Sequence, residues 1–298
     1  MKPNPRFLNL GKDFWANIRT ISEATGYRLT QGNMTLLGQA EKRIIKVPTP
    51  LDIKSAYEKL GLSTAHILEN KDGFTDFGKL IRSYFEYRAD VLVEKVEPNL
   101  MNMREAKAEF ERLRKKLHSK CPIPMNKQKG EKKAPAYFTG IINMLIEANS
   151  RDLPTDYDPH HLTTVTRDSK PLRTLSRRVD GAFPKVVNPI AIWEIKEYYY
   201  TTTFGSRVAD GVYESLLDGM ELEELYENEN VKVRHYLMID AYSTWWNKGI
   251  SFLCRIIDML QMGYVDEVLV GREVLFRLPE LVKEWVEQSR RNVRHQQP

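Results

Sequence analysis

The amino-acid sequence predicts a mixed α/β (α+β) fold, in which a central sheet flanked by helices follows a mainly helical N-terminal region. Up to about residue 120, apolar residues recur at helical spacing. From residue 137 onwards, helical patterns alternate with short apolar runs that are typical of strands. The chain has 298 residues, of which 42% are hydrophobic and 29% are charged. It can therefore bury a sizeable core, in one large domain or two smaller ones.

The first helices have recognisable boundaries. The stretch "FWANIRTISE" (Phe14–Glu23) places its apolar residues at helical spacing. A second helix is expected to begin at Thr49 or Asp52 and to stop at Gly61, and a third to begin at Ser63. Helix, glycine turn and helix form the outline of a helix-turn-helix DNA reader, although any two packed helices share that outline. Longer helical patterns cover residues 74–96 and 102–118.

Positive charge is concentrated in the N-terminal half, with a net charge of about +9 in residues 1–150 and about −4 in residues 151–298. The densest basic run, Glu111 to Lys133, could neutralise the phosphates of a polyanion. The alternative is a solvated helix end followed by a flexible linker. We expect three parts: residues 1–120, mainly helical and a candidate DNA-binding region; residues 121–136, a basic Pro/Lys/Gly linker; and residues 137–298, the α/β domain.

The sequence favours a cytoplasmic protein that does not associate with a membrane. No segment approaches the ~20 continuous apolar residues of a membrane helix, and the first residues lack the apolar core of a secretory signal. The two cysteines, Cys121 and Cys254, are far apart and lack metal-ligand spacing. This argues against a disulfide framework or a structural zinc site.

The C-terminal half reads as a helix, two strands, a helix, a strand, a helix, a strand and a closing helix, which is a mixed α/β layer. The corresponding residue ranges are 137–150, 172–183, 189–199, 201–227, 231–243, 249–263, 265–271 and 278–293.

A candidate site lies on the two most strand-like segments, "RRVDGAF" and "PIAIWEIKEYY". Strand alternation sends Glu194 and Lys196 to the same face, and Asp180 lies near Glu194 if the two segments pair as a hairpin. Two converging carboxylates suit Mg²⁺, and a neighbouring lysine can stabilise an attacking hydroxide and the charge that develops on phosphorus. The alternative is a surface hairpin in which Glu194 and Lys196 form a solvated ion pair worth at most about 1 kcal/mol.

Asp180, thirteen intervening residues and then Glu194-x-Lys196 resemble the motif of the PD-(D/E)XK nuclease superfamily. The resemblance covers roughly residues 137–270 and includes the order helix, hairpin, helix, strand. It implies a restriction-endonuclease-like core and Mg²⁺-dependent hydrolysis of phosphodiesters. It also implies that Asp180 and Glu194 are metal ligands and that Lys196 is the charged partner of the attacking water.

Two further positions bear on this resemblance. Many members of the superfamily carry a catalytic glutamate on the preceding helix, and Glu147 stands where that residue is expected. Val179 stands where the superfamily name has proline, a position that varies often.

Other residues are candidates for binding DNA. Arg173, Arg177 and Arg178 come just before Asp180 and suit the binding of phosphates, or they form an exposed basic turn. Ser206 and Arg207 stand near the start of an expected helix, where phosphate can bind, although ordinary helix capping explains the serine equally well.

We therefore expect a Mg²⁺-dependent DNA endonuclease, resembling sequence-specific type II restriction enzymes. The expected substrate is double-stranded DNA, cut by a homodimer that matches a two-fold symmetric site, and a DNA methyltransferase is expected to be encoded nearby. Two alternatives stay open. One is a nuclease effector of phage defence or a repair nuclease, with nonspecific or structure-specific cleavage. The other is a catalytically inactive DNA-binding protein.

Overall fold

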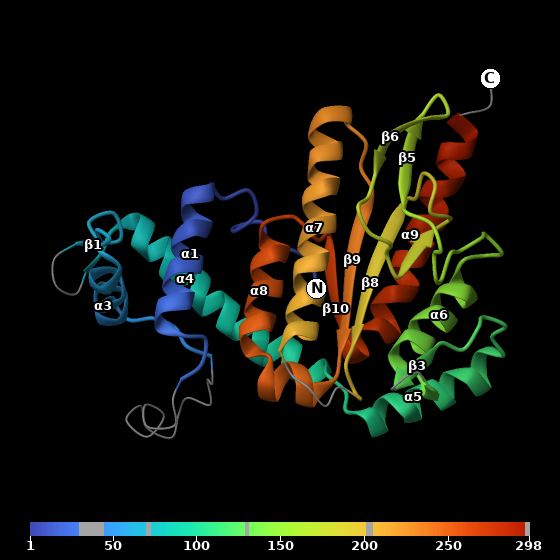
Figure 1. The fold of residues 1–298 in the computed structure, drawn as a ribbon, viewed down its shortest axis with the longest axis horizontal. Helices are drawn as coiled ribbons and strands as arrows, with labels where there is room; N and C mark the ends of the chain where they lie inside the picture. Colours follow the sequence, from blue (N-terminus) through green and yellow to red (C-terminus); the bar gives the residue numbers. More distant parts are fainter. Residues whose placement is uncertain (30–44, 70–72, 129–130, 201–204, 296–298) are drawn as a thin grey trace.

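A four-stranded mixed sheet forms the centre of the molecule, with helices on both of its faces (Figure 1). The computed structural model describes residues 1–29, 45–69, 73–128, 131–200 and 205–295. The strand order is β10-β9-β8-β7, in which β7 pairs antiparallel with β8 and the other neighbours are parallel. The strands are β7 (Gly181–Phe183), β8 (Ala191–Glu197), β9 (Arg234–Asp240) and β10 (Glu267–Val270). The mixed α/β class predicted from the sequence is therefore confirmed.

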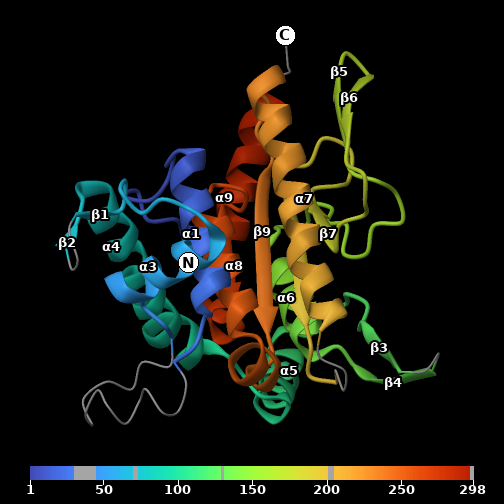
Figure 2. The same ribbon diagram turned by 60° about the vertical axis from the view of Figure 1, so that its left-hand side comes forward.

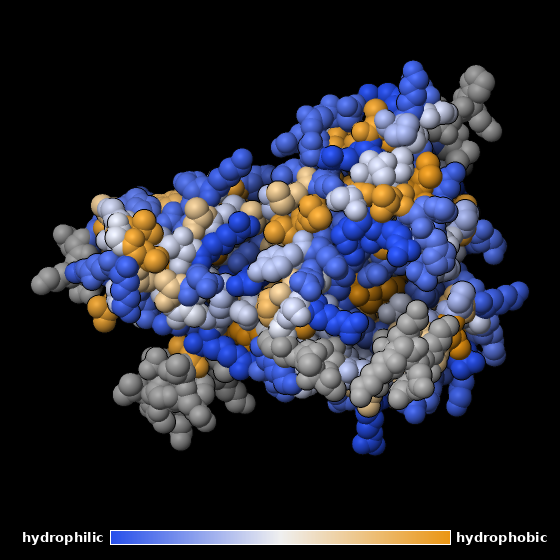
Figure 3. Space-filling model, viewed as in Figure 1, coloured by the Kyte–Doolittle hydropathy of each residue, from blue (hydrophilic) through white to orange (hydrophobic). Residues whose placement is uncertain are grey.

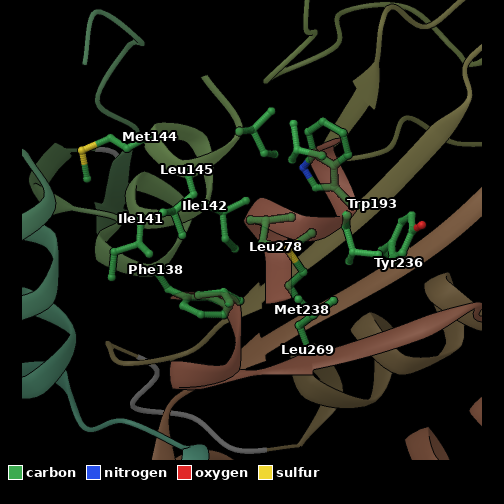
Figure 4. Packing of buried hydrophobic residues seen from close by; sticks show 14 of the residues in the cluster. Phe138, Ile141, Ile142, Met144, Leu145, Trp193, Tyr236, Met238, Leu269 and Leu278 are labelled. Carbon is green, nitrogen blue, oxygen red and sulfur yellow. The ribbon is translucent and has the colours of Figure 1, made fainter. Parts of the chain in front are cut away.

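Two helices cover each face of this sheet. One face packs against α6 (Tyr137–Asn149) and α9 (Val274–His295), and Figure 4 shows Phe138 and Ile142 of α6, Leu278 of α9 and the sheet residues Trp193 and Met238 in this layer. The opposite face packs against α7 (Ser206–Glu229) and α8 (Ile250–Gln261). α7 connects β8 to β9, and α8 connects β9 to β10; both pairs of strands are parallel. Helices in such connections cover the sheet, which is why its strands are apolar on both faces.

The β7–β8 hairpin is held by close packing of aromatic rings. Trp193 of β8 is fully buried and stacks on Trp285 of α9, with ring centroids 5.7 Å apart and an angle of 7° between the planes. A Cβ on Gly181, the partner of Trp193 across the hairpin, would lie 2.1 Å from the Trp193 ring. Glycine is therefore required directly after Asp180.

The N-terminal helices pack on the α7–α8 side of the sheet (Figures 1 and 2). They are α1 (Lys12–Thr25), α3 (Pro50–Leu60), α4 (Asp76–Val91), the π-helical turn Leu92–Val96 and the short 3₁₀ turn Glu97–Asn99. α4 is joined to α8 by a buried ion pair between Arg88 and Asp258, with Nη1 to Oδ1 at 3.0 Å. Helix α5 (Met103–Leu117) starts at an Asn102–Glu105 capping box and packs on α6.

The helix-turn-helix outline expected after Thr49 does not form. α3 begins with a Thr49–Asp52 capping box and ends at Gly61, which takes the left-handed conformation expected of a helix stop. The third helix expected from Ser63 is instead a turn that leads into β1 (Leu68–Glu69), which pairs with β2 (Gly73–Phe74). Since a second helix is required to enter a DNA groove, this segment is not a helix-turn-helix reader.

Two hairpins that the sequence did not predict extend from the α/β part. β3 (Met125–Gln128) and β4 (Glu131–Pro135) pair within the segment expected to be a linker, although two residues of that basic run, Lys129 and Gly130, lie outside the described residues. β5 (Thr164–Arg167) pairs with β6 (Lys170–Thr174), and Figure 2 shows this hairpin projecting beside α7.

Exposed hydrophobic side chains are scattered over the surface. On the face seen in Figure 3, hydrophilic residues predominate and hydrophobic residues form small separate groups. Within the described parts of the chain, none of the helices is long and apolar enough to span a membrane.

The Arg88–Asp258 pair should stabilise the attachment of the N-terminal helices to α8. Because Arg88→Ala leaves the buried carboxylate of Asp258 without its cation, we expect it to lower the free energy of unfolding by about 3 kcal/mol or more, as measured by urea denaturation. The control Arg82→Ala removes an exposed pair with Glu86 on the same helix and should cost less than about 1 kcal/mol. Equal losses in the two variants would contradict a special role for Arg88.

Candidate active site

The β7–β8 hairpin brings Asp180 and Glu194 together. Asp180 directly precedes β7, and its backbone N–H donates to Glu194 Oε1 at 3.2 Å. In return, Asp180 Oδ2 accepts a hydrogen bond of 2.7 Å from the backbone N–H of Ile195. The pairing register, in which Gly181 lies opposite Trp193, extends by one residue to place Asp180 opposite Glu194. The hairpin predicted from the sequence is thus present, and it fixes the two carboxylates side by side.

Lys196 lies next to Glu194 on the face of β8 that packs against α7. Its Nζ is 2.7 Å from Glu194 Oε2 and 2.9 Å from Oε2 of Glu214 on α7. The helix can approach this closely because residue 211 is glycine: a Cβ there would lie 2.4 Å from the Tyr198 hydroxyl and 3.0 Å from Lys196 Cδ. Glu194 is fully buried and Lys196 nearly so, which rules out the solvated surface pair that was the alternative interpretation.

Arg177 completes the site from the chain that precedes β7. Its guanidinium lies 2.9 Å from Glu194 Oε1, 2.6 Å from Asp218 Oδ2 and 3.3 Å from Glu214 Oε2. Glu214 and Asp218 are one turn apart on α7, so they face the same way. We call Arg177, Asp180, Glu194, Lys196, Glu214 and Asp218 the carboxylate cluster.

The carboxylate cluster holds four acids and two cations, and burial together with the charges of its neighbours perturbs the pKa values of its members. Burial and the neighbouring charge of Glu194 raise the pKa of Asp180 to about 6 and that of Asp218 to about 7. Burial also acts to raise the pKa of Glu194, but Lys196 and Arg177 outweigh it and hold that pKa below its ordinary value. For Lys196, burial acts to lower the pKa, yet Glu194 and Asp180 outweigh it and raise the pKa above its ordinary value.

The oxygen ligands of the carboxylate cluster fit a divalent cation, provided that Arg177 moves away from Glu194. Surplus negative charge and carboxylate oxygens are what Mg²⁺ selects, and it needs only one or two protein carboxylates when water and phosphate supply the rest. Within the described residues, no three Asp, Glu, His or Cys side chains form a ready metal-ligand group. Both oxygens of Glu194 are already occupied. Oε1 is contacted by the backbone N–H of Asp180 and by Arg177, and Oε2 accepts from Arg177 and Lys196. Arg177 therefore has to withdraw before Glu194 can coordinate a metal beside Asp180.

Glu147, expected to join the site from the preceding helix, is engaged elsewhere. Its carboxylate accepts hydrogen bonds from the Ser119 hydroxyl and from the backbone N–H of Lys120, the latter at 3.0 Å. The α6 residues that share a cavity with Asp180 are Thr139 and Asn143, which lie two turns and one turn before Glu147 on the helix. This difference arises because the helix presents Asn143, and not Glu147, towards the end of β7 and β8.

The residues expected to bind DNA are distributed unevenly. Arg173 pairs with Glu224 of α7, and Arg178 is exposed. Ser206 and Arg207 are exposed at the start of α7, where the backbone carbonyl of Arg207 accepts a hydrogen bond of 3.2 Å from Tyr198. Of the five residues, Arg177 is the one that the structure brings into the carboxylate cluster.

Sequence reasoning missed Glu214 and Asp218. A signal for them exists in the stretch "GVYESLLDG", because Gly211, Ser215 and Gly219 recur every four residues and are all buried. Small residues at this spacing indicate a helix face in close contact with another element. Glu214 and Asp218 each lie next to that face, so a closer reading would have placed them near the sheet.

The fold and the carboxylate cluster define a mixed α/β protein with a buried, charge-rich site at the edge of its sheet. The chain belongs to the family described as "Domain of unknown function (DUF7687)", which matches residues 101–285. A second family, "Domain of unknown function (DUF7690)", matches residues 1–95. No curated protein matches the chain, and no solved structure does so either.

The raised pKa values make the carboxylate cluster less stable as the pH rises. Between about pH 4 and pH 7 the folded protein keeps protons on Asp180 and Asp218 that the unfolded chain has released, so their contribution to the free energy of unfolding falls through this range. Asp218→Asn removes one of these carboxyls. Measured by urea denaturation, the stability of Asp218→Asn relative to the unsubstituted protein should increase by on the order of 2 kcal/mol between about pH 5 and pH 8.

The exposed Asp168, at the tip of the β5–β6 hairpin, provides the control, and Asp168→Asn should follow the unsubstituted protein across the same range. A difference between Asp218→Asn and the unsubstituted protein that stays constant with pH would contradict the raised pKa of Asp218.

Proposed function

We propose that this protein is a Mg²⁺-dependent DNA endonuclease with a restriction-endonuclease-like core. The observation that carries the proposal is the convergence of Asp180, Glu194 and Lys196 at one end of the β7–β8 hairpin. Ligand sites of mixed α/β sheets commonly lie near the carboxyl ends of parallel strands, and Glu194 and Lys196 stand in the last half of β8, which runs parallel to β9. The Asp…Glu-x-Lys spacing resembles that of PD-(D/E)XK nucleases, and this resemblance suggests phosphodiester hydrolysis as the reaction.

In the proposed mechanism, Asp180 and Glu194 would hold Mg²⁺, and the ion would supply Lewis-acid stabilisation of the scissile phosphate. Lys196 Nζ orients the attacking water and stabilises the negative charge that develops in the transition state. Glu214, at 2.9 Å from Lys196 Nζ, fixes the direction of that ammonium group. The pKa of Asp218, raised to about 7, allows this carboxylate to exchange a proton near neutral pH, so that the attacking water can lose its proton within the site.

Arg177 has two positions in this proposal. In the structure it neutralises Glu194 and Asp218, which keeps the buried acids compensated. With a cation held by Asp180 and Glu194, the guanidinium of Arg177 would be free to leave Glu194 and to bind a DNA phosphate in bidentate fashion. Arg177 would thus bind phosphate, as the sequence suggested, after giving up contacts that the sequence did not reveal.

The proposed substrate is double-stranded DNA, cut in sequence-specific fashion by a homodimer as in type II restriction enzymes, with a DNA methyltransferase encoded nearby. One observation favours a second candidate, a nuclease effector of phage defence: both oxygens of Glu194 are occupied by Arg177 and Lys196, and such a site has to be activated before it can cut. A repair nuclease or an inactive DNA-binding protein would share the fold. Observing where DNA is cut distinguishes these possibilities.

Cleavage of phage λ DNA tests the proposal directly. We expect discrete new ends in Mg²⁺ and none in EDTA, and sequencing of these ends would give the recognition sequence. A smear of fragments would indicate the effector, and intact DNA in both conditions, together with a gel shift, would indicate a binding protein.

Lys196→Ala tests the assignment of the site. Because the transition state would lose its charged partner, we expect cleavage to fall by about 100-fold or more while DNA affinity stays within about twofold. Lys185→Ala removes an exposed lysine from the turn between β7 and β8 and serves as the matched control with unchanged cleavage. Full activity of folded Lys196→Ala would exclude Lys196 from catalysis.

A further inference from the structure

A cavity of about 620 Å³ opens beside Asp180, on the face of the sheet opposite to Lys196 and Glu214. Its walls are α6, the chain from Pro122 to Met125 and the loop that carries Tyr157 and Asp158, and Ile195 lies at its base. This volume lies in the range of small-molecule pockets. Because Asp180 belongs both to the cavity and to the carboxylate cluster, a group bound in the cavity would adjoin a phosphate bound at the cluster.

Asn143 supplies an unused polar group to this cavity. Its side chain is 3% exposed, and its Oδ1 has no hydrogen-bond partner. A buried amide oxygen without a partner is unfavourable, and a ligand that donates a hydrogen bond to it would relieve that cost. Since that oxygen has no hydrogen bond to lose, the amide can rotate about χ2 and present a donor beside an acceptor to a ligand.

The lining of the cavity excludes an anion and favours a flat, polar-edged ring. The described lining residues include the carboxylates of Asp158 and Asp180 but no lysine or arginine, so a phosphate would not be bound there. Burial raises the pKa of the Tyr157 phenol to about 12, and the neutral ring can stack on a planar group. The prolines, Ile123 and Met125 in the chain from Pro122 to Met125 offer an apolar wall to such a ring.

We propose that this cavity binds one unpaired nucleobase of the DNA, with Asn143 contacting its hydrogen-bonding edge. A side-chain amide pairs with the adjacent donor and acceptor of adenine, and the carboxylate of Asp158 can accept from an amino group. The choice of ligand rests on the proposed nuclease function, because the neighbouring Asp180 would bind the adjoining phosphate through Mg²⁺.

This assignment narrows the substrate class. Removing a base from a paired duplex is unfavourable, and least so where the base is mismatched, bulged or already single-stranded. Stacking of one base on an aromatic ring strengthens binding and offsets part of this cost. DNA that already carries an unpaired base should therefore bind more tightly than a perfect duplex.

Fluorescence anisotropy with labelled duplexes tests the inference in EDTA, where no cleavage is expected. One duplex carries a single bulged adenine, the second carries an abasic spacer at the same position, and the third is fully paired. The unsubstituted protein should bind the bulged adenine about tenfold more tightly than the abasic duplex. In Asn143→Ala this preference should fall below about threefold, whereas Asn149→Ala, on the same helix but outside the cavity lining, should keep it.

Tyr157→Leu, which removes the stacking ring from a loop, provides a second variant if Asn143→Ala does not fold. Equal affinity of the unsubstituted protein for the adenine and abasic duplexes, or a preference kept in both variants, would overturn the inference. Cleavage in Mg²⁺ without any adenine preference would support the nuclease function and contradict base binding in the cavity. An adenine preference that is lost in Asn143→Ala, but without cleavage of any DNA, would keep the pocket and remove the nuclease.

Discussion

The carboxylate of Glu194 is the point on which the local structure depends. It is fully buried and accepts hydrogen bonds from the backbone of Asp180, from Arg177 and from Lys196. These contacts join β8 to β7, to the chain before β7 and, through Glu214, to α7. A buried carboxylate is tolerated only when partners compensate its charge. The packing of these elements therefore depends on the charge balance of the site.

The carboxylate cluster contains more acids than cations, which points to a chemical role beyond stabilising the fold. Simple stabilisation would need no more carboxylates than cations, and buried ion pairs are weak contributors to stability in any case. Here burial and the neighbouring charge of Glu194 raise the pKa values of Asp180 and Asp218, and the two cations do not offset this effect. Titratable groups perturbed in this way are typical of sites that bind a cation or transfer protons.

The sequence predicted much of the sheet but little of the contact between its layers. Alternation along β8 placed Glu194 and Lys196 on one face, and the hairpin placed Asp180 beside them, because both follow from local periodicity. The partners of Arg177 on α7 could not be predicted, since they depend on how closely a distant helix packs. The same holds for α6, where one helical turn separates the expected Glu147 from Asn143. The linker prediction missed β3 and β4 because polar, basic residues lack the alternation of a buried strand.

Isothermal titration calorimetry of Mg²⁺ binding, in two buffers of different ionisation enthalpy near pH 6.5, tests the central claim that the carboxylate cluster is a cation site. Binding should release a fraction of a proton, because Asp180, with a pKa of about 6, is still partly protonated at this pH and Mg²⁺ binds the ionised form. Asp180→Asn should abolish the binding heat, whereas Asp168→Asn should leave it unchanged. Absence of Mg²⁺ binding to the folded protein, or binding that Asp180→Asn leaves intact, would contradict the account.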